Sequence, residues 1–287
     1  MAGQPKAGRN AHPGLKGVSQ LYGRHPGSDI FVVGTGPSLR VFPVELLAGR
    51  VTIGLNMAWK LVDVDYAITV HPELNIPELM EGEHARPSIT WVTKHEKLGN
   101  LTAEQIAYAE ERFYFFRTDG KKNTSTTAQS NAGQVPQWLA RPTGEFLYLL
   151  SSISQPAVNL AANMGARNIV LVGCDNAALF GNHHAHDQHT SWLGERPEDR
   201  YREYYRGLAE ARTVLRERGV NLVSMGPFLT LGPHEEEFVA LCHELGRPEL
   251  IPNHDRPAPP RRAPLTPVQR AKGKARAAAR RLAGGRR

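Results

Sequence analysis

Seven short apolar runs that alternate with stretches of helical spacing constrain the fold of this chain most. The runs are rich in β-branched and aromatic residues, and each has the length of one strand. They are Ile30–Val33, Val51–Leu55, Tyr66–Val70, Ile89–Val92, Phe113–Phe116, Asn168–Val172 and Asn221–Val223. Apolar strands that alternate with helices are typical of a parallel sheet covered on both faces. The sequence therefore predicts an α/β fold in one domain, with a Rossmann-like parallel sheet.

Helical spacing of apolar residues fills most of the intervals between these runs. The predicted helices are Val44–Ala48, Ile76–Met80, Thr102–Glu111, Ala157–Gly165, Asp199–Arg218 and Glu235–Leu245. The segments 117–142 and 176–199 break the pattern. Loops of this length inside a domain are often lids or binding loops, and a disordered insertion is the alternative.

Charge is distributed unevenly along the chain. Of the 35 Lys and Arg residues, 11 lie in Arg256–Arg287, which has no acidic residue, so the other 255 residues carry 24 basic and 28 acidic side chains, a net charge of −4. The sequence predicts a flexible segment over 1–27, a catalytic domain over 28–250 and a disordered tail over 251–287. The tail has three interpretations: nucleic-acid binding, binding to an anionic lipid surface, or no fixed partner.

The remaining composition limits the class of protein. No run of 18 apolar residues is present, and residues 1–27 lack the apolar core of a signal peptide. Cys174 and Cys242 are too few for a disulfide framework. These features predict a cytoplasmic protein without a transmembrane segment, and they leave its oligomeric state open.

A glycine loop follows the first apolar run and is the first candidate for a ligand site. The sequence Asp29-Ile-Phe-Val-Val-Gly-Thr-Gly-Pro-Ser-Leu39 indicates a buried strand, a turn with two glycines, and a helix start at which Ser38 is the expected N-cap. Free N–H groups in such a turn bind phosphate. The third glycine of the dinucleotide motif is absent, so a generic turn is the alternative.

Polar residues follow several of the other predicted strands. Asn56 follows the second strand, His71 the third, Thr93-Lys94-His95 the fourth and Asp175 the sixth. Ligands of open parallel sheets bind beyond the carboxyl ends of the strands. We therefore expect these residues to line one polar rim.

The same motifs carry a resemblance to a known superfamily. Gly34-Thr-Gly-Pro-Ser-Leu39, Asn56 after a strand, and Ser152-Ile-Ser154 before Gly165–Asp175 resemble the bacterial sialyltransferases with a single Rossmann-like domain and the MptE-like proteins. The resemblance implies that the glycine loop and Asn56 hold the nucleotide of an activated donor, with the two serines near the nucleotide or phosphate. The predicted donor-binding residues are Gly34, Thr35, Gly36, Pro37, Ser38, Asn56, His71, Ser152 and Ser154.

A histidine cluster, Asn182-His-His-Ala-His-Asp-Gln-His189, lies in the second long loop. Three interpretations stay open: a divalent-ion site, a general base that acts on an acceptor hydroxyl, and a solvated loop. His184-Ala185 after the strand that carries Asp175 resembles the MptE-like branch. The predicted catalytic residues are His184, His186 and Asp175, and no resident metal is predicted.

These features together predict a glycosyltransferase. It would move a sugar from a nucleotide-activated donor of the CMP- or UDP-sugar type to a hydroxyl acceptor. The first alternative is a 6-hydroxymethylpterin-type diphosphokinase that uses ATP and Mg²⁺, with Asp175 near the metal. The second alternative is a non-catalytic protein that binds nucleotides or nucleic acid.

Overall fold

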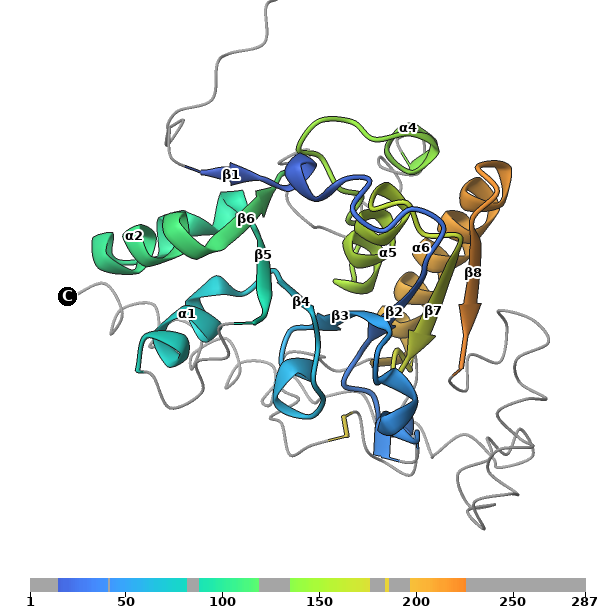
Figure 1. Ribbon diagram of the computed structural model, residues 1–287, viewed down its shortest axis with the longest axis horizontal. Coiled ribbons are helices and arrows are strands. Elements are labelled where there is room, and N and C mark those ends of the chain that lie inside the picture. The colour runs from blue at the N-terminus through green and yellow to red at the C-terminus, as the bar shows by residue number, and fades with distance from the viewer. Residues whose placement is uncertain are drawn as a thin grey trace, which may run out of the picture. The chain divides into compact units, whose positions relative to one another are not determined.

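The fold is a single eight-stranded parallel sheet with helices packed on it (Figure 1). The computed structural model describes residues 15–40, 42–81, 88–118, 135–175, 184–185 and 197–225. The strands are β1 Lys16–Gly17, β2 Asp29–Val33, β3 Val51–Leu55, β4 Tyr66–Thr69, β5 Thr90–Lys94, β6 Phe113–Phe116, β7 Asn168–Val172 and β8 Asn221–Ser224. Their order in the sheet is β1-β6-β5-β4-β3-β2-β7-β8, and every neighbouring pair is parallel. The α/β fold class and all seven predicted strands are confirmed.

The described α-helices are α1 Pro72–Met80, α2 Ala103–Arg112, α4 Val135–Ala140, α5 Ser154–Asn163 and α6 Pro197–Glu217. The described 3-10 helices are η1 Val18–Leu21, η2 Pro37–Arg40, η3 Val44–Leu47, η4 Ala58–Lys60 and η5 His95–Asn100. The predicted helix at Val44–Ala48 is thus a 3-10 turn, and α4 lies in a segment predicted as a loop. The predicted helix Glu235–Leu245 and the tail 251–287 lie outside the described residues.

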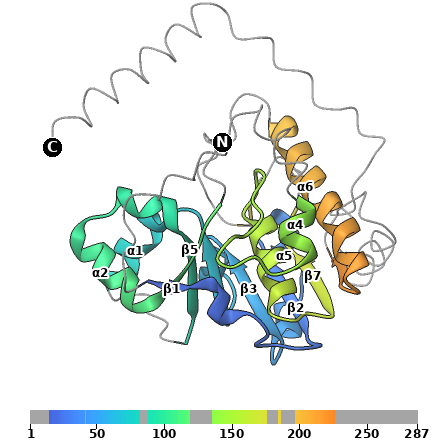
Figure 2. The ribbon, with the colours of Figure 1, turned by 90° about the horizontal axis from the view of Figure 1, so that it is seen from above.

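Helices α5 and α6 lie on one face of the sheet and α1 and α2 on the other (Figure 2), and an apolar core lies on each face. On one face, Ile30, Ile53 and Ile169 pack with Leu160 of α5 and Leu208 of α6. On the other face, Val33 of β2 and Val170 of β7 belong to a second core, which includes side chains of η4, α1 and α2. Alternate residues of one strand point to opposite faces. β2 and β7 supply residues to both cores, so both strands are apolar after their first residue.

The segment before β2 belongs to this fold. β1 pairs with β6, and Val18 and Leu21 have no exposed surface. Three N–H groups of the next segment donate to carbonyls at and just beyond the C-terminal end of α5, each at 2.8 Å: Gly23 to Asn163, His25 to Met164 and Gly27 to Gly165. The predicted domain boundary at residue 28 is therefore corrected, because the segment 15–27 contributes a strand to the sheet, side chains to the core and hydrogen bonds to the end of α5.

The chain path creates a switch point beside β2. From β2 the chain adds β3, β4, β5 and β6 on one side, and then returns to place β7 and β8 on the other side. In open α/β sheets, ligands bind at such a switch point, beyond the carboxyl ends of the strands. None of the helices in the described part of the chain is long and apolar enough to cross a membrane.

Candidate functional site

The glycine loop after β2 crosses the end of β7 at close range. Gly34 N–H donates to the Val172 carbonyl at 2.8 Å, and Gly36 N–H donates to the Gly173 carbonyl at 2.7 Å. A Cβ at Gly34 would lie 2.3 Å from the Gly173 oxygen, and one at Gly36 would lie 2.6 Å from Asp175 Oδ2. The two glycines are therefore explained by the close approach of two backbone segments.

Ser38 binds Asp175 instead of capping an α-helix. It lies inside η2, its N–H donates to Asp175 Oδ2 at 2.6 Å, and its hydroxyl donates to Oδ1 at 2.5 Å. Burial raises the pKa of Asp175 to about 6, against the opposing effect of the Ser38 hydrogen bonds. The expected phosphate cradle of free N–H groups is thus wrong for Gly34, Gly36 and Ser38, because all three donate within the protein.

The described part of the histidine loop lies on the same glycine loop. His184 Nδ1 lies 3.2 Å from Thr35 Oγ1, and Ala185 N–H donates to the Thr35 carbonyl at 2.6 Å. Arg40 Nε donates to the Ala185 carbonyl at 2.8 Å. The structure therefore joins two predicted site segments that are 149 positions apart, although His184 Nε2 is buried. His186 lies outside the described residues.

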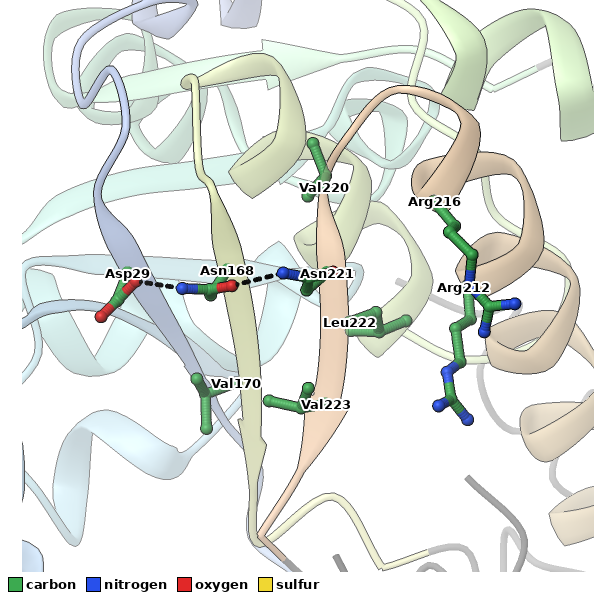
Figure 3. A pocket seen from close by; sticks show the side chains of 9 residues that line it. All are labelled: Asp29, Asn168, Val170, Arg212, Arg216, Val220, Asn221, Leu222 and Val223. Atoms are coloured by element: carbon green, nitrogen blue, oxygen red, sulfur yellow. Dashed lines mark hydrogen bonds between the residues drawn. The ribbon is translucent and has the colours of Figure 1, made fainter. Parts of the chain in front are cut away.

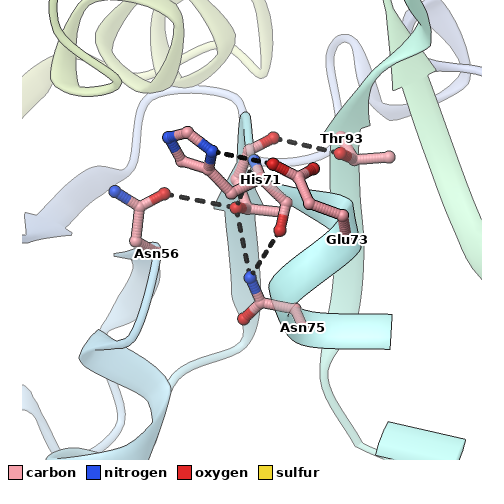
Figure 4. A network of polar contacts seen from close by, with 6 residues as sticks. Asn56, His71, Glu73, Asn75 and Thr93 are labelled. Atoms are coloured by element: carbon pink, nitrogen blue, oxygen red, sulfur yellow. Dashed lines mark hydrogen bonds and ion pairs between the residues drawn. The ribbon is translucent and has the colours of Figure 1, made fainter. Parts of the chain in front are cut away.

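A polar network follows β3 and β4 (Figure 4). Asn56 has a φ of +49°, and among the described non-glycine residues only Asn56 has a positive φ. Apart from glycine, asparagine is among the residues that adopt this left-handed conformation most readily. Asn56 Oδ1 accepts from Thr69 Oγ1 at 3.2 Å, and Thr69 Oγ1 accepts from His71 N–H at 3.0 Å. The threonine thus ties the two predicted rim residues together.

His71 precedes α1 and pairs with a carboxylate. Its Nδ1 lies 3.1 Å from Glu73 Oε1, and the two side chains are 47% and 29% exposed. Asn75 Nδ2 donates to the His71 carbonyl at 3.0 Å. Sequence reasoning identified His71 but missed Thr69, Glu73 and Asn75. The signal for Glu73 was its position in the first turn of a helix that begins at Pro72.

Ser152 and Ser154 lie at the start of α5, with their hydroxyl oxygens 2.8 Å apart. A residue that sequence reasoning missed organises this turn. Gln155 Oε1 accepts the N–H groups of three residues, at 2.8, 3.0 and 3.2 Å: Leu150, Ser151 and Ser152. The donor-binding role of the two serines remains a prediction.

The strand order decides which rim residues lie near one another. Neighbouring strands are about 4.8 Å apart, so the loops after β2, β3 and β4 occupy a rim about 10 Å wide. Thr35, Asn56 and His71 belong to this rim, whereas Arg117 follows β6, about 19 Å from β2. Arg117 lies instead beside His95 and Glu145 in a cavity of about 280 Å³. The described residues hold no group of three or more His, Cys, Asp or Glu arranged for a metal.

A second cavity, of about 310 Å³, is lined partly by residues at the start of β2, β7 and β8 (Figure 3). Asn168 Nδ2 donates to Asp29 Oδ1 at 2.6 Å, and Asn221 Nδ2 donates to Asn168 Oδ1 at 2.8 Å. Arg212 and Arg216 of α6 also line it. These strand starts lie at the amino edge of the sheet, opposite the predicted rim, and no predicted site residue lines this cavity.

Comparison with known proteins gives one structural similarity. No protein-family model and no curated protein sequence matches this chain. The fold is similar to a solved structure of the sialyltransferase CstII from Campylobacter jejuni in complex with a substrate analogue, cytidine-5'-monophosphate. The match has 11% sequence identity and a TM-score of 0.40, and it covers 71% of this chain and 82% of that chain.

Proposed function

We propose that this protein is a transferase that takes a sugar from a nucleotide-activated donor of the CMP- or UDP-sugar type and passes it to a hydroxyl acceptor. The observation that carries the proposal is the polar rim of Thr35, Asn56 and His71 beside the β2/β7 switch point. This is the usual place for a nucleotide in open α/β sheets. The resemblance of the linked sequence motifs to nucleotide-dependent transferases supports the same conclusion.

Asn56 offers a hydrogen-bond donor to the nucleotide. Its Oδ1 is used by Thr69, so its amide nitrogen is the group left to face a ligand. A ribose hydroxyl, a base carbonyl or a phosphate oxygen would accept from it. The hydroxyl pair of Ser152 and Ser154 would supply further contacts at the start of α5.

Asp175 acts in this proposal as a positioning residue. Both of its carboxylate oxygens accept hydrogen bonds from Ser38, so it fixes the glycine loop against β7. In the diphosphokinase alternative Asp175 would lie on Mg²⁺, which would require it to release Ser38. No contact in the described residues favours that alternative over sugar transfer.

Nucleotide binding by the full-length protein tests the proposal. We expect CMP, UDP and their sugar conjugates to raise the melting temperature, and the conjugates to release free nucleotide on incubation. ATP with Mg²⁺ is the comparison for the diphosphokinase. A shift with ATP–Mg²⁺ alone, or binding without any turnover, would contradict sugar transfer.

The substitution Asn56→Gly tests the proposed binding site most directly. Glycine keeps the positive φ without strain and removes the amide. One lost hydrogen bond of about 1–1.5 kcal/mol corresponds to about tenfold weaker nucleotide binding. Asn221→Ala, at the amino end of β8, is the matched control and should bind like the wild type. Equal affinities for the Asn56 variant and the wild type would remove Asn56 from the site.

A further inference from the structure

His71, directly before α1, is held by three polar contacts. Its Nδ1 faces Glu73 Oε1 at 3.1 Å, its N–H donates to Thr69 Oγ1 at 3.0 Å, and its carbonyl accepts from Asn75 Nδ2 at 3.0 Å. Backbone and ring are therefore both fixed, although nearly half of the side chain is exposed. Fixed orientation with an accessible ring is what a proton-transfer group requires.

The carboxylate of Glu73 determines which ring nitrogen of His71 can accept a proton. A carboxylate oxygen accepts a hydrogen bond, so Glu73 keeps the proton of the neutral imidazole on Nδ1. The lone pair then lies on Nε2, the other ring nitrogen. In Figure 4 that nitrogen and the amide nitrogen of Asn56 lie on the same side of the network. The basic nitrogen of His71 therefore faces the region in which the proposed donor lies.

His184, one of the two histidines that the sequence predicts as catalytic, has a different environment. Its Nδ1 faces the hydroxyl of Thr35 rather than a carboxylate, and its Nε2 is buried. An acceptor hydroxyl reaches the ring of His71, whose side chain is 47% exposed, more readily than a buried nitrogen. The contrast favours His71 over His184 as the group that meets the acceptor.

We propose that His71 is the general base of the transfer and that Glu73 is its positioning residue, an inference that rests on the proposed function. The acceptor hydroxyl gives its proton to His71 Nε2 while its oxygen forms a bond to the anomeric carbon of the donor. The bond from that carbon to the nucleotide phosphate oxygen breaks, and its electron pair leaves on the phosphate. The imidazolium then releases its proton to solvent. When water is the acceptor, the same step is donor hydrolysis.

Release of nucleotide from CMP-sialic acid and from UDP-N-acetylglucosamine by the full-length protein tests this role. We expect His71→Ala to lower the turnover of the accepted donor by about 10²- to 10⁴-fold and to change CMP or UDP affinity by less than about threefold. Free imidazole, which can enter the exposed space left by the ring, should restore part of the rate. Glu73→Gln should lower turnover less, and added imidazole should not restore it because the ring is still present.

Leu74→Ala is the control, since Leu74 is 63% exposed in the same helical turn, and it should keep wild-type turnover. Wild-type turnover in His71→Ala would overturn the inference alone. Loss of both turnover and nucleotide affinity without imidazole rescue would also overturn it, because His71 would then be a donor-binding residue only. A wild-type protein that neither binds these nucleotides nor releases them from their sugars would overturn the proposed function together with the inference.

Discussion

The missing side chain at Gly36 allows the carboxylate of Asp175 to lie against the loop after β2. A Cβ there would lie 2.6 Å from Asp175 Oδ2 and 2.7 Å from the Gly173 oxygen. Gly36→Ala should therefore lower the free energy of unfolding by about 1–3 kcal/mol, the usual cost of overpacking a buried site. Urea denaturation measures this change. Gly99→Ala is the control because nothing lies within 4 Å of its added Cβ. Equal losses in the two variants would contradict the close approach.

The carboxyl of Asp175 should make stability depend on pH. Burial raises its pKa from 3.8 to about 6, so the folded state holds this proton more tightly than the unfolded chain. Its contribution is fully present below pH 3.8 and is lost as pH rises through 6. The loss is about 3 kcal/mol at 1.36 kcal/mol per pKa unit.

Asp175→Asn isolates this contribution. The difference in unfolding free energy between the wild type and the variant should shift against the wild type between pH 4 and pH 7, while the other titrating groups cancel. Urea denaturation at half-unit pH steps measures it. Parallel stability curves for the two proteins would show that the carboxyl does not titrate in this range.

At the scale of elements, the strands were predictable because each of the seven carries its own apolar pattern. β1 was not, since Lys16 and Gly17 form a strand only by pairing with β6.

The Ser38–Asp175 contact joins residues 137 positions apart. The sequence predicted a phosphate at the glycine loop, but the N–H and the hydroxyl of Ser38 donate to the carboxylate of Asp175 instead. Contacts between residues so far apart leave no local signal in the sequence, so the contact between the glycine loop and Asp175 could not be predicted from residue spacing.

The start of α5 depends on a contact with α6. A Cβ at Gly207 would lie 2.1 Å from Gln155 Nε2, and Gln155 holds the turn that leads to Ser152. Alanine normally stabilises a helix by about 1 kcal/mol relative to glycine. We expect Gly207→Ala to lower the melting temperature instead, because the methyl group displaces Gln155.

A double-mutant cycle separates the steric effect from helix propensity. In the Gln155→Ala background the space beside residue 207 is open, so Gly207→Ala should be neutral or stabilising. The same loss in both backgrounds would place the cause outside the Gln155 contact. Donor binding, measured on the same variants, would show whether the turn supports the proposed site.

At the scale of the whole molecule, the net charge sets the C-terminal tail apart from the rest of the chain, whereas burial joins the N-terminal segment 15–27 to the folded domain. The basic residues at Arg256–Arg287 give the protein its positive net charge of +7, while the other 255 residues are slightly acidic. The tail lies outside the described residues, and an anionic partner for it remains a prediction. Burial, in contrast, extends the folded part toward the N-terminus, to residues whose polar and glycine-rich composition predicted a flexible segment.

Leu21 tests whether the N-terminal segment is part of the cooperative unit. It has no exposed surface and packs in the same core as Ile30, Leu160 and Leu208. Leu21→Ala should lower the free energy of unfolding by about 2–5 kcal/mol, the cost of a large-to-small change in a packed core. Its neighbour Gln20 is exposed, so Gln20→Ala should change stability by less than about 0.5 kcal/mol. Chemical denaturation followed by both tryptophan fluorescence and circular dichroism should give one shared transition that moves for Leu21→Ala. A separate early transition, with the main one unchanged, would mean that residues 15–27 unfold independently of the sheet.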